Sequence, residues 1–413
     1  MLPLIALRNL ARNRRRTLLA VLVVAAGSAG LLVTAGFVRY SFDGLSEAII
    51  HGGLGHIEVI PAADLAESVL PGERAGRPPG MNQWADVREA IETQPQVRAA
   101  GAVIQFAGVA THDDRTASFV GAGNEPERMR EMDIETRLRA GSGLPDAPPA
   151  QGADAAIVGV GLARALGVSP GDTMTVIVST VDGSLNAVDV RVTGLFSTGL
   201  QELDARMLQV HLRTAQRVLG TPLVTSLVVG LTDDAQAGRV EAALQTALSG
   251  RGQPLTVLGW EVRAPFYQQV RGLYLGIFVF LGTIVALLVV LSAANTLLMS
   301  MLERTREFGT LLAIGTTRRQ LAALMMLEAN WLALGGGAVG CAIAVAVSAG
   351  LDLLGIKMPP PPGAVDPVDL ALMMLPGDFL WAMVVMAMIL SVAAVPAILR
   401  LVRLRIVDAL GHV

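Results

Sequence analysis

Few side chains in this sequence are spaced for catalysis or for binding a nucleotide. The chain has one lysine, Lys357, which lies in the run Gly355-Ile356-Lys357-Met358. A phosphate-binding P-loop needs Gly-Lys-Ser/Thr, so this chain alone is not predicted to be a conventional nucleotide hydrolase. Its one cysteine, Cys341, can form neither an intramolecular disulfide nor a cysteine-based zinc site.

The histidines and serines also lack the spacing of known active sites. No two histidines form a His-Glu-x-x-His or His-x-x-x-His pattern, and the proximity of His51 and His56 does not by itself predict a metal site. Gly141-Ser142-Gly143 lies in a Gly/Pro-rich stretch, whereas a nucleophile elbow needs a strand-to-helix turn. We therefore predict no catalytic, cofactor-binding or metal-binding residue. Arginine and aromatic residues are not interleaved as in nucleic-acid-binding proteins.

The composition indicates a membrane protein. Of the 413 residues, 52% are hydrophobic and 16% are charged, whereas a soluble protein carries about 25% charged residues. Four stretches without charge each provide the roughly 20 apolar residues of a transmembrane helix. They lie between Arg16 and Arg39, Arg271 and Glu303, Glu328 and Asp352, and Asp378 and Arg400. The first is longer than the roughly 7–15 apolar residues of a signal peptide, so we interpret it as a retained signal anchor.

Arginines predict which segments face the cytoplasm. They outnumber acids in the N-terminal segment, in the loop after the second span and in the C-terminal tail, whereas acids predominate in the other two segments. We predict a polytopic α-helical inner-membrane protein with both termini cytoplasmic and a large α+β periplasmic domain between the first two of four transmembrane helices. The four predicted transmembrane helices are residues 17–40, 272–302, 320–351 and 378–400. The predicted cytoplasmic parts are the basic amphipathic segment 1–16, the coupling helix and loop 303–319 and the tail 401–413. The predicted periplasmic parts are the α+β domain 41–271 and the short proline-rich loop 352–377.

The inserted domain contains two predicted strand–helix–strand units. The first comprises a strand at 55–60, a helix at 84–93 and strands at 97–111 and 116–120. The second comprises a strand at 226–231, a helix at 234–248 and a strand at 254–258. Two such units predict a ferredoxin-like or related α+β layer. Between them we predict loops or a short helix at 123–153, then short strands and turns with one helix at 160–166.

The loop after the second span carries an apolar helical face beside a cluster of charges. The apolar positions follow an i, i+3, i+4, i+7 spacing at Phe308, Leu311, Leu312 and Gly315, and the charges are Glu303, Arg304, Arg306 and Glu307. This pattern fits either an interfacial connector or a helix that presents its charged end to a cytosolic partner. Glu328 is explained equally by a charge at the membrane surface and by an internal ion pair with a nearby arginine.

The run from Asn295 to Gly315, with the core Glu-Arg-Thr-Arg-Glu-Phe-Gly, resembles the signature of ABC permeases of the MacB/FtsX/LolE family. Residues 157–172 and 192–204 are similar to the family's periplasmic core, and the second stretch is most similar to the lipoprotein-releasing permeases LolC and LolE. The resemblance implies a cytoplasmic helix that docks in a separate ATPase dimer, which binds the ATP and Mg²⁺. The implied coupling residues are Glu303, Arg304, Arg306, Glu307, Phe308, Gly309 and Gly315.

The resemblance also implies a non-catalytic permease subunit of the mechanotransmission type, which extracts or exports lipoprotein or lipid-like cargo. Its expected partners are the ATPase, a second copy or a related permease, and a periplasmic adaptor or carrier. A MacB-like efflux permease for peptides or drugs and an FtsX-like regulator of cell-wall hydrolases are the alternatives. Because only residues 179–187 join two predicted strands, a hook that captures a lipoprotein carrier is not expected here.

Small and polar residues in the first two spans are candidates for contact with cargo or with a second permease. Ala26 and Gly30 form a small-xxx-small pair, which allows helices to approach closely. Packing within the subunit is the favoured explanation for this pair and for Gly335-Gly336-Gly337, and contact between permeases or a lateral substrate gate at the first two spans is the alternative. The predicted cargo-facing or dimer-packing residues are Ala26, Gly30, Phe37, Phe278 and Asn295.

Overall fold

The computed structural model describes residues 14–65, 80–134, 136–148, 152–199, 201–250, 252–358 and 368–403. The chain divides into two compact units. One comprises Met1–Phe42, Arg271–Met358 and Asp369–Val413, and the other comprises Asp43–Val270 and Pro359–Val368. Most of the predicted basic segment, the proline run at 359–362 and most of the C-terminal tail lie outside the described residues.

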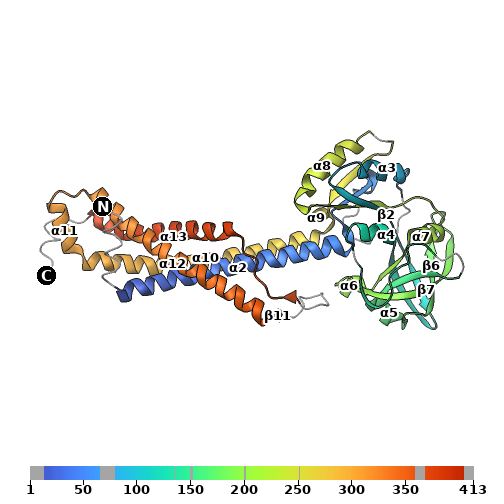
Figure 1. Ribbon diagram of the computed structural model, residues 1–413, viewed down its shortest axis with the longest axis horizontal. Helices are drawn as coiled ribbons and strands as arrows, with labels where there is room; N and C mark the ends of the chain where they lie inside the picture. The colour runs from blue at the N-terminus through green and yellow to red at the C-terminus, as the bar shows by residue number, and fades with distance from the viewer. Residues whose placement is uncertain are drawn as a thin grey trace. The chain divides into compact units, whose positions relative to one another are not determined.

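The first unit contains four helices that are long and apolar enough to cross a membrane. They are α2 (Arg14–Ile49), α10 (Pro265–Glu303), α12 (Arg318–Leu354) and α13 (Pro376–Arg403). The short helix α11 (Thr305–Ala313) connects α10 to α12 at one end of the bundle (Figure 1). Four spans with one domain inserted between the first two confirm the predicted architecture.

Glycines on α12 allow it to approach α2 closely. A Cβ atom on Gly340 would lie 2.6 Å from the carbonyl oxygen of Ala25, and one on Gly336 would lie 2.6 Å from Cβ of Val24. Residues of all four long helices, together with Phe308 of α11, then form one buried apolar cluster. Within the predicted glycine stretch, Gly336 and Gly337 are therefore buried inside the subunit, whereas Gly335 is exposed.

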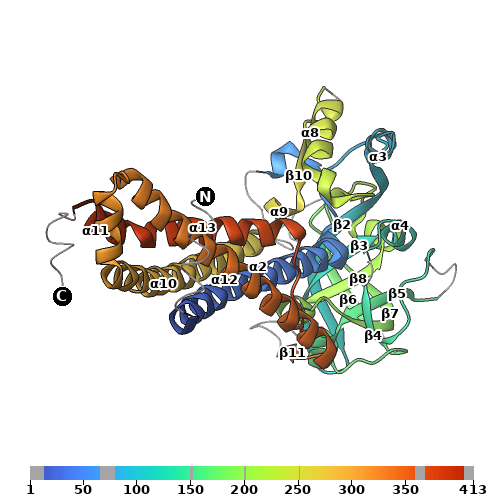
Figure 2. The same cartoon turned by 60° about the vertical axis from the view of Figure 1, so that its left-hand side comes forward.

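The inserted unit begins and ends in a ferredoxin-like layer. Its strand order is β10-β1-β9-β2, and every neighbouring pair is antiparallel. Two helices connect these strands and lie near each other (Figures 1 and 2). The order matches the layer that the sequence predicts. The elements are β1 (Ile57–Pro61), α3 (Trp84–Glu92), β2 (Val97–His112), β9 (Ser226–Leu231), α8 (Ala237–Leu248) and β10 (Leu255–Gly259).

The remaining strands form a second layer that shares β2 with the first. The pairings β2–β3–β8–β5–β7–β6–β2 close a ring of six strands, and β4 extends it from β7. The strands are β3 (Arg115–Asn124), β4 (Arg137–Gly141), β5 (Asp154–Gly159), β6 (Thr173–Ser179), β7 (Leu185–Ser197) and β8 (Met207–His211). The helices are α4 (Pro126–Glu131), α5 (Val160–Leu166), α6 (Gln201–Asp204) and α7 (Leu212–Leu219).

Two predictions for this insertion were incomplete. Residues 123–153 contain the strand β4 as well as a short helix, because the backbone of 137–141 pairs with β7 despite exposed side chains. Among the described residues of 157–219, α6 and α7 accompany the predicted helix at 160–166, and α7 agrees with the helix start near Thr214 that the family resemblance implies. The additional helix α7 is stabilised by packing, since it buries Leu212, Ala215 and Val218.

A buried ion pair lies where the inserted unit begins and ends. Glu58 of β1 pairs with Arg263 of α9 (Trp260–Arg263), and the two side chains are only 7% and 3% exposed. The amide of Trp260 also donates to the carbonyl of His56, at 3.0 Å. The chain therefore enters and leaves this unit through neighbouring, mutually bonded segments. The short remaining elements are η1 (Ile50–Leu54), η2 (Ala62–Asp64), η4 (Asp234–Gln236), β11 (Lys357–Met358) and β12 (Val368–Asp369).

Candidate coupling surface

Helix α11 is bounded by a non-helical joint at each end. Arg304 interrupts the helical backbone between α10 and α11, with φ −108° and ψ 14°. At the other end Gly315 has φ +104°, a conformation that favours glycine. Helix α12 then starts with a capping box, in which Thr317 and Gln320 exchange side-chain and backbone hydrogen bonds. Position 315 therefore serves the turn and lies outside the helix.

The buried face of α11 differs from the predicted one. Thr305, Phe308 and Gly309 are buried and Leu312 is half-buried, whereas Leu311 is exposed. The predicted face is thus confirmed at Phe308 and Leu312 but not at Leu311 and Gly315, because the helix ends at Ala313 and packs through its first two turns. Phe308 is only 1% exposed, and it shares a core cluster with α12 residues Leu321, Leu324 and Met325.

Arg304 points into the bundle, and its predicted role in coupling stays a prediction. Its side chain is 12% exposed, and its Nε and Nη1 atoms donate to Glu307 and Glu328 respectively, at 2.9 Å each. The guanidinium carbon also lies 5.0 Å from the centre of the Phe308 ring. Burial alone would lower the pKa of Arg304, but the bonds and charges of both glutamates raise it.

Glu328 takes part in this internal ion pair rather than reaching the membrane surface. Its side chain is 3% exposed. Of the two interpretations that the sequence leaves open, the structure selects the ion pair.

The side of α11 that faces away from α12 forms an exposed surface, which we call the coupling surface. It contains exposed charges at Glu303 and Arg306, and Ile314 is 83% exposed beside them. Glu307 is partly exposed. Its members are Glu303, Arg306, Thr310, Leu311, Ile314 and Gly315. Of the predicted coupling residues, Arg304, Phe308 and Gly309 lie behind this surface. Ile314 is exposed next to the glycine that ends the helix, and it was not among the predicted coupling residues.

Ala26 and Gly30 lie on an exposed face of α2, so packing within the subunit was the wrong interpretation of this pair. No atom of the described residues lies within 4 Å of a Cβ atom placed on Gly30, whereas the neighbouring Ala25 and Ala29 pack against Gly340. Phe37 is half-buried. The face with Ala26 and Gly30 is thus open on the subunit.

Helix α10 is the least covered of the four spans. Only 17% of its most apolar window is buried, compared with 33% to 39% in the other spans. Asn295 is exposed on it, whereas Asn330 of α12 lies within hydrogen-bonding distance, 3.5 Å, of the Ser391 hydroxyl. Phe278 is half-buried, with its ring centre 6.1 Å from that of Tyr274.

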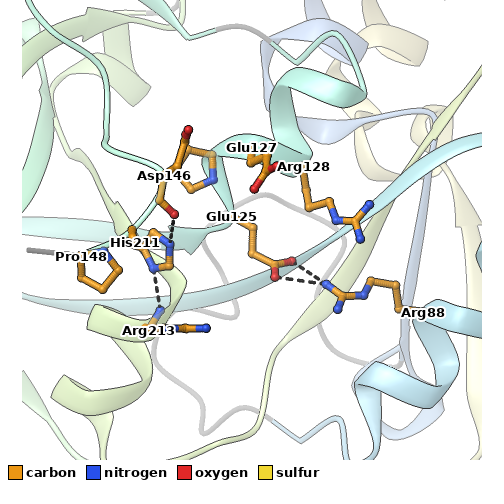
Figure 3. Close-up of a pocket in the computed structure, with 10 residues that line it drawn as sticks. Arg88, Glu125, Glu127, Arg128, Asp146, Pro148, His211 and Arg213 are labelled. Carbon is orange, nitrogen blue, oxygen red and sulfur yellow. Dashed lines mark hydrogen bonds and ion pairs between the residues drawn. The ribbon is translucent and has the colours of Figure 1, made fainter.

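A polar cavity of about 270 Å³ lies in the inserted unit between α3, α4 and the start of α7 (Figure 3). Ion pairs bridge the helices there: Arg88 bonds both carboxylate oxygens of Glu125 at 3.1 Å, and Arg128 lies 3.4 Å from Glu92. His211 caps α7 by accepting from the amide of Arg213. Most of the charges that line the cavity thus connect neighbouring elements, and we interpret the cavity as a structural junction.

The histidine in this cavity is held in one tautomer. Because Nδ1 of His211 accepts a hydrogen bond, Nε2 carries the proton and donates to the carbonyl oxygen of Asp146, at 3.1 Å. Burial lowers the pKa of His211 despite that backbone bond. Among the described residues, no group of three His, Cys, Asp or Glu side chains is placed to hold a metal ion.

Two family profiles match the chain. The MacB-like periplasmic core domain matches residues 17–247, more than half of the chain, and the FtsX-like permease C-terminal domain matches residues 279–406. The chain belongs to the MacB/FtsX family of permeases. The second match includes α11 with its coupling surface. The coupling surface thus lies in the part of the chain that matches the FtsX-like permease domain.

The chain is also similar to curated exporters. The pyoverdine export ATP-binding/permease protein PvdT of Pseudomonas putida is 26% identical over 302 residues, which are 68% of this chain and 44% of the relative. The macrolide export ATP-binding/permease protein MacB of Agrobacterium fabrum is 28% identical over 154 residues, 36% of this chain and 24% of the relative. This chain thus spans less than half the length of these relatives. They do not support the specific closeness to LolC and LolE, which stays a prediction.

Two solved structures are similar to about half of the chain. The extracellular domain of the transporter YknZ from Gram-positive bacteria gives a TM-score of 0.35 at 15% identity, and covers 49% of this chain and 99% of that structure. The periplasmic region of MacB from Actinobacillus actinomycetemcomitans gives 0.38 at 13% identity, and covers 54% and 95%.

Proposed function

We propose that this chain is the membrane subunit of an ABC transporter of the mechanotransmission type. A separate cytosolic ATPase dimer would bind ATP and Mg²⁺ and contact the coupling surface. The observation that carries the proposal is α11 itself. It is a short helix with one face buried against α12 and the other exposing Arg306, it is followed directly by the exposed Ile314, and it lies between two non-helical joints.

In this proposal, closure of the ATPase displaces α11 and, with it, the cytoplasmic ends of α10 and α12. Both termini and α11 would face the cytoplasm, and the inserted unit would face the periplasm. Two copies, or this chain and a related permease, would flank the ATPase. The open faces with Ala26, Gly30 and Asn295 would then contact the second permease or the cargo, which is consistent with the sparse burial of α10.

For the cargo, we propose an amphiphilic molecule taken from the outer leaflet, with lipoprotein or another lipid-linked molecule as the first class. The second class is a smaller molecule exported with a periplasmic adaptor, and the names of PvdT and MacB favour it. The β6–β7 hairpin also favours it. This turn spans only Thr180 to Ser184 and is closed by a 2.8 Å backbone bond, which leaves no extended hook for a lipoprotein carrier.

The proposal is tested by replacing Glu303 and Arg306 with alanine in the full-length chain and purifying it in detergent. We expect weaker association with the co-purifying ATPase, or nucleotide hydrolysis that no longer drives movement, with membrane insertion unchanged. Arg319→Ala is the matched control, since Arg319 is exposed on the first turn of α12. Unchanged association and unchanged coupling in the double variant would remove the assignment.

The cargo class is tested by mass spectrometry of the molecules that co-purify and by crosslinking from residues 25–40 and 275–295. Crosslinks to an acylated protein support the first class, and crosslinks to a small molecule support the second. A bound soluble cell-wall hydrolase without either cargo would instead indicate an FtsX-like regulator.

A further inference from the structure

A buried ion pair connects the joint before α11 to the interior of α12. We propose that Arg304 and Glu328 are positioning residues that transmit displacement of α11 to α12. This inference rests on the proposed function, because it assumes that an ATPase moves α11. It assigns both residues to a step after the ATPase has docked, which explains why neither is on the coupling surface.

The covalent connection alone transmits such a displacement poorly. A single non-helical residue joins α10 to α11, and the turn that joins α11 to α12 contains Gly315 at φ +104°. The backbone leaves the helical conformation at both connections, and local bonds such as that from the Arg304 amide to the Met301 carbonyl, at 3.2 Å, span the first of them. A displacement of α11 would be absorbed at these joints unless a non-covalent contact fixed α11 to a neighbouring span.

The guanidinium of Arg304 is placed to make that contact. Its Nε donates to Glu307 within α11, and its Nη1 donates to Glu328 within α12, so one planar group bridges the two helices. Apolar packing of Phe308 against α12 tolerates sliding, since dispersion and hydrophobic contacts have little directionality. A guanidinium–carboxylate bond is directional and specifies one relative position of the two helices.

The position of Glu328 indicates that the pair serves more than packing. Glu328 follows Arg318, the first residue of α12, by ten residues, which corresponds to about 15 Å along a helix axis at 1.5 Å per residue. A carboxylate at 3% exposure in an apolar helix is costly, and an apolar side chain would fill the space as well. A charge retained there is better explained by a need for a defined geometry.

The test uses the full-length chain with its co-purified ATPase. Hydrogen–deuterium exchange of α11 and α12 is measured with and without a non-hydrolysable ATP analogue. In the wild type we expect the analogue to change exchange in both helices. In Glu328→Gln, which keeps the shape and removes the charge, we expect the ATPase to remain bound and the change in α11 to persist, but the change in α12 to be lost.

Two variants separate this role from simple stability. Glu307→Gln removes the other carboxylate that Arg304 contacts, but this one belongs to α11 itself, so the change in α12 should remain. Glu328→Asp keeps the charge and should retain at least part of the response. If Glu328→Gln aggregates, Arg304→Gln, which removes the cation of the same pair, takes its place with the same expected loss. A full α12 response in Glu328→Gln, or no recovery in Glu328→Asp, overturns the inference. A wild type that binds no ATPase overturns the proposed function instead.

Discussion

Glu58 and Arg263 offer a quantitative test of how the inserted unit is held together where the chain enters and leaves it. Both side chains are more than nine-tenths buried, and they join β1 to α9. We predict that Arg263→Met destabilises the inserted unit strongly. The substitution keeps a similar side-chain length but leaves the carboxylate of Glu58 buried without its cation.

Removing one partner of a buried ion pair costs about 3–5 kcal/mol, because the remaining charge is uncompensated. For a domain of 150–250 residues, each kcal/mol shifts the unfolding midpoint by about 2–4 °C, so a decrease of roughly 6–20 °C is expected. The double variant Glu58→Leu/Arg263→Met removes both charges and should recover most of this loss. The exposed pair Arg130–Asp146 is the matched control, because exposed pairs contribute only about 0–1 kcal/mol.

The assay is thermal unfolding of the full-length chain in detergent, followed by tryptophan fluorescence, which includes the nearby Trp260. Arg130→Met should shift the midpoint by less than about 4 °C. If Arg263→Met and Arg130→Met produced equal shifts, burial would not determine the strength of these pairs, and the reasoning would be refuted. A double variant no more stable than Arg263→Met would contradict it equally.

Three further predictions concern packing and pH. Phe308→Ala should destabilise α11 by about 3–5 kcal/mol and accelerate its amide exchange, whereas Ile314→Ala should leave exchange unchanged because that side chain is exposed. Gly340→Leu should disrupt the contact of α2 with α12 and reduce the yield of folded protein, whereas Gly350→Leu, which meets open space, should not. Burial lowers the pKa of His211 below its ordinary value of 6.5, so the unfolded chain binds more protons as pH falls through that range. The contribution of His211 to the free energy of unfolding should therefore be fully present above about pH 6.5 and should decrease below it. His211→Asn keeps a helix cap and should remove this part of the loss, as measured by urea unfolding at pH 7 and pH 5.

Several features were predictable from the sequence because they depend on local composition. The four spans follow from stretches without charge, since a charged side chain in the bilayer is costly wherever it lies along the helix. The ferredoxin-like layer follows from the alternation of strand and helix patterns, and its strand order agrees. The position of α11 follows from a short motif between two apolar stretches, whereas its role as a coupling element stays a proposal.

Other features depend on contacts between distant residues. Arg304 and Glu328 are 24 residues apart, and nothing local distinguishes a buried arginine from an exposed one in the same cluster. The pairing of β4 with β7 likewise connects residues about 55 positions apart, at an edge where side-chain burial gives no pattern. Both contacts join elements that are far apart in the sequence, so neither contact could be predicted from the residues around it.

The sequence by itself determined the number of membrane spans, the place of the inserted domain and the segment that connects the second and third spans. Each of these depends only on whether a continuous run of residues is apolar enough for the bilayer or polar enough for water. Only the tertiary structure decided which face of α11 is buried, that Arg304 turns inward, and that Ala26 and Gly30 lie open. A helix has several faces of similar composition, and the one it buries is chosen by the shape and charge of its neighbours.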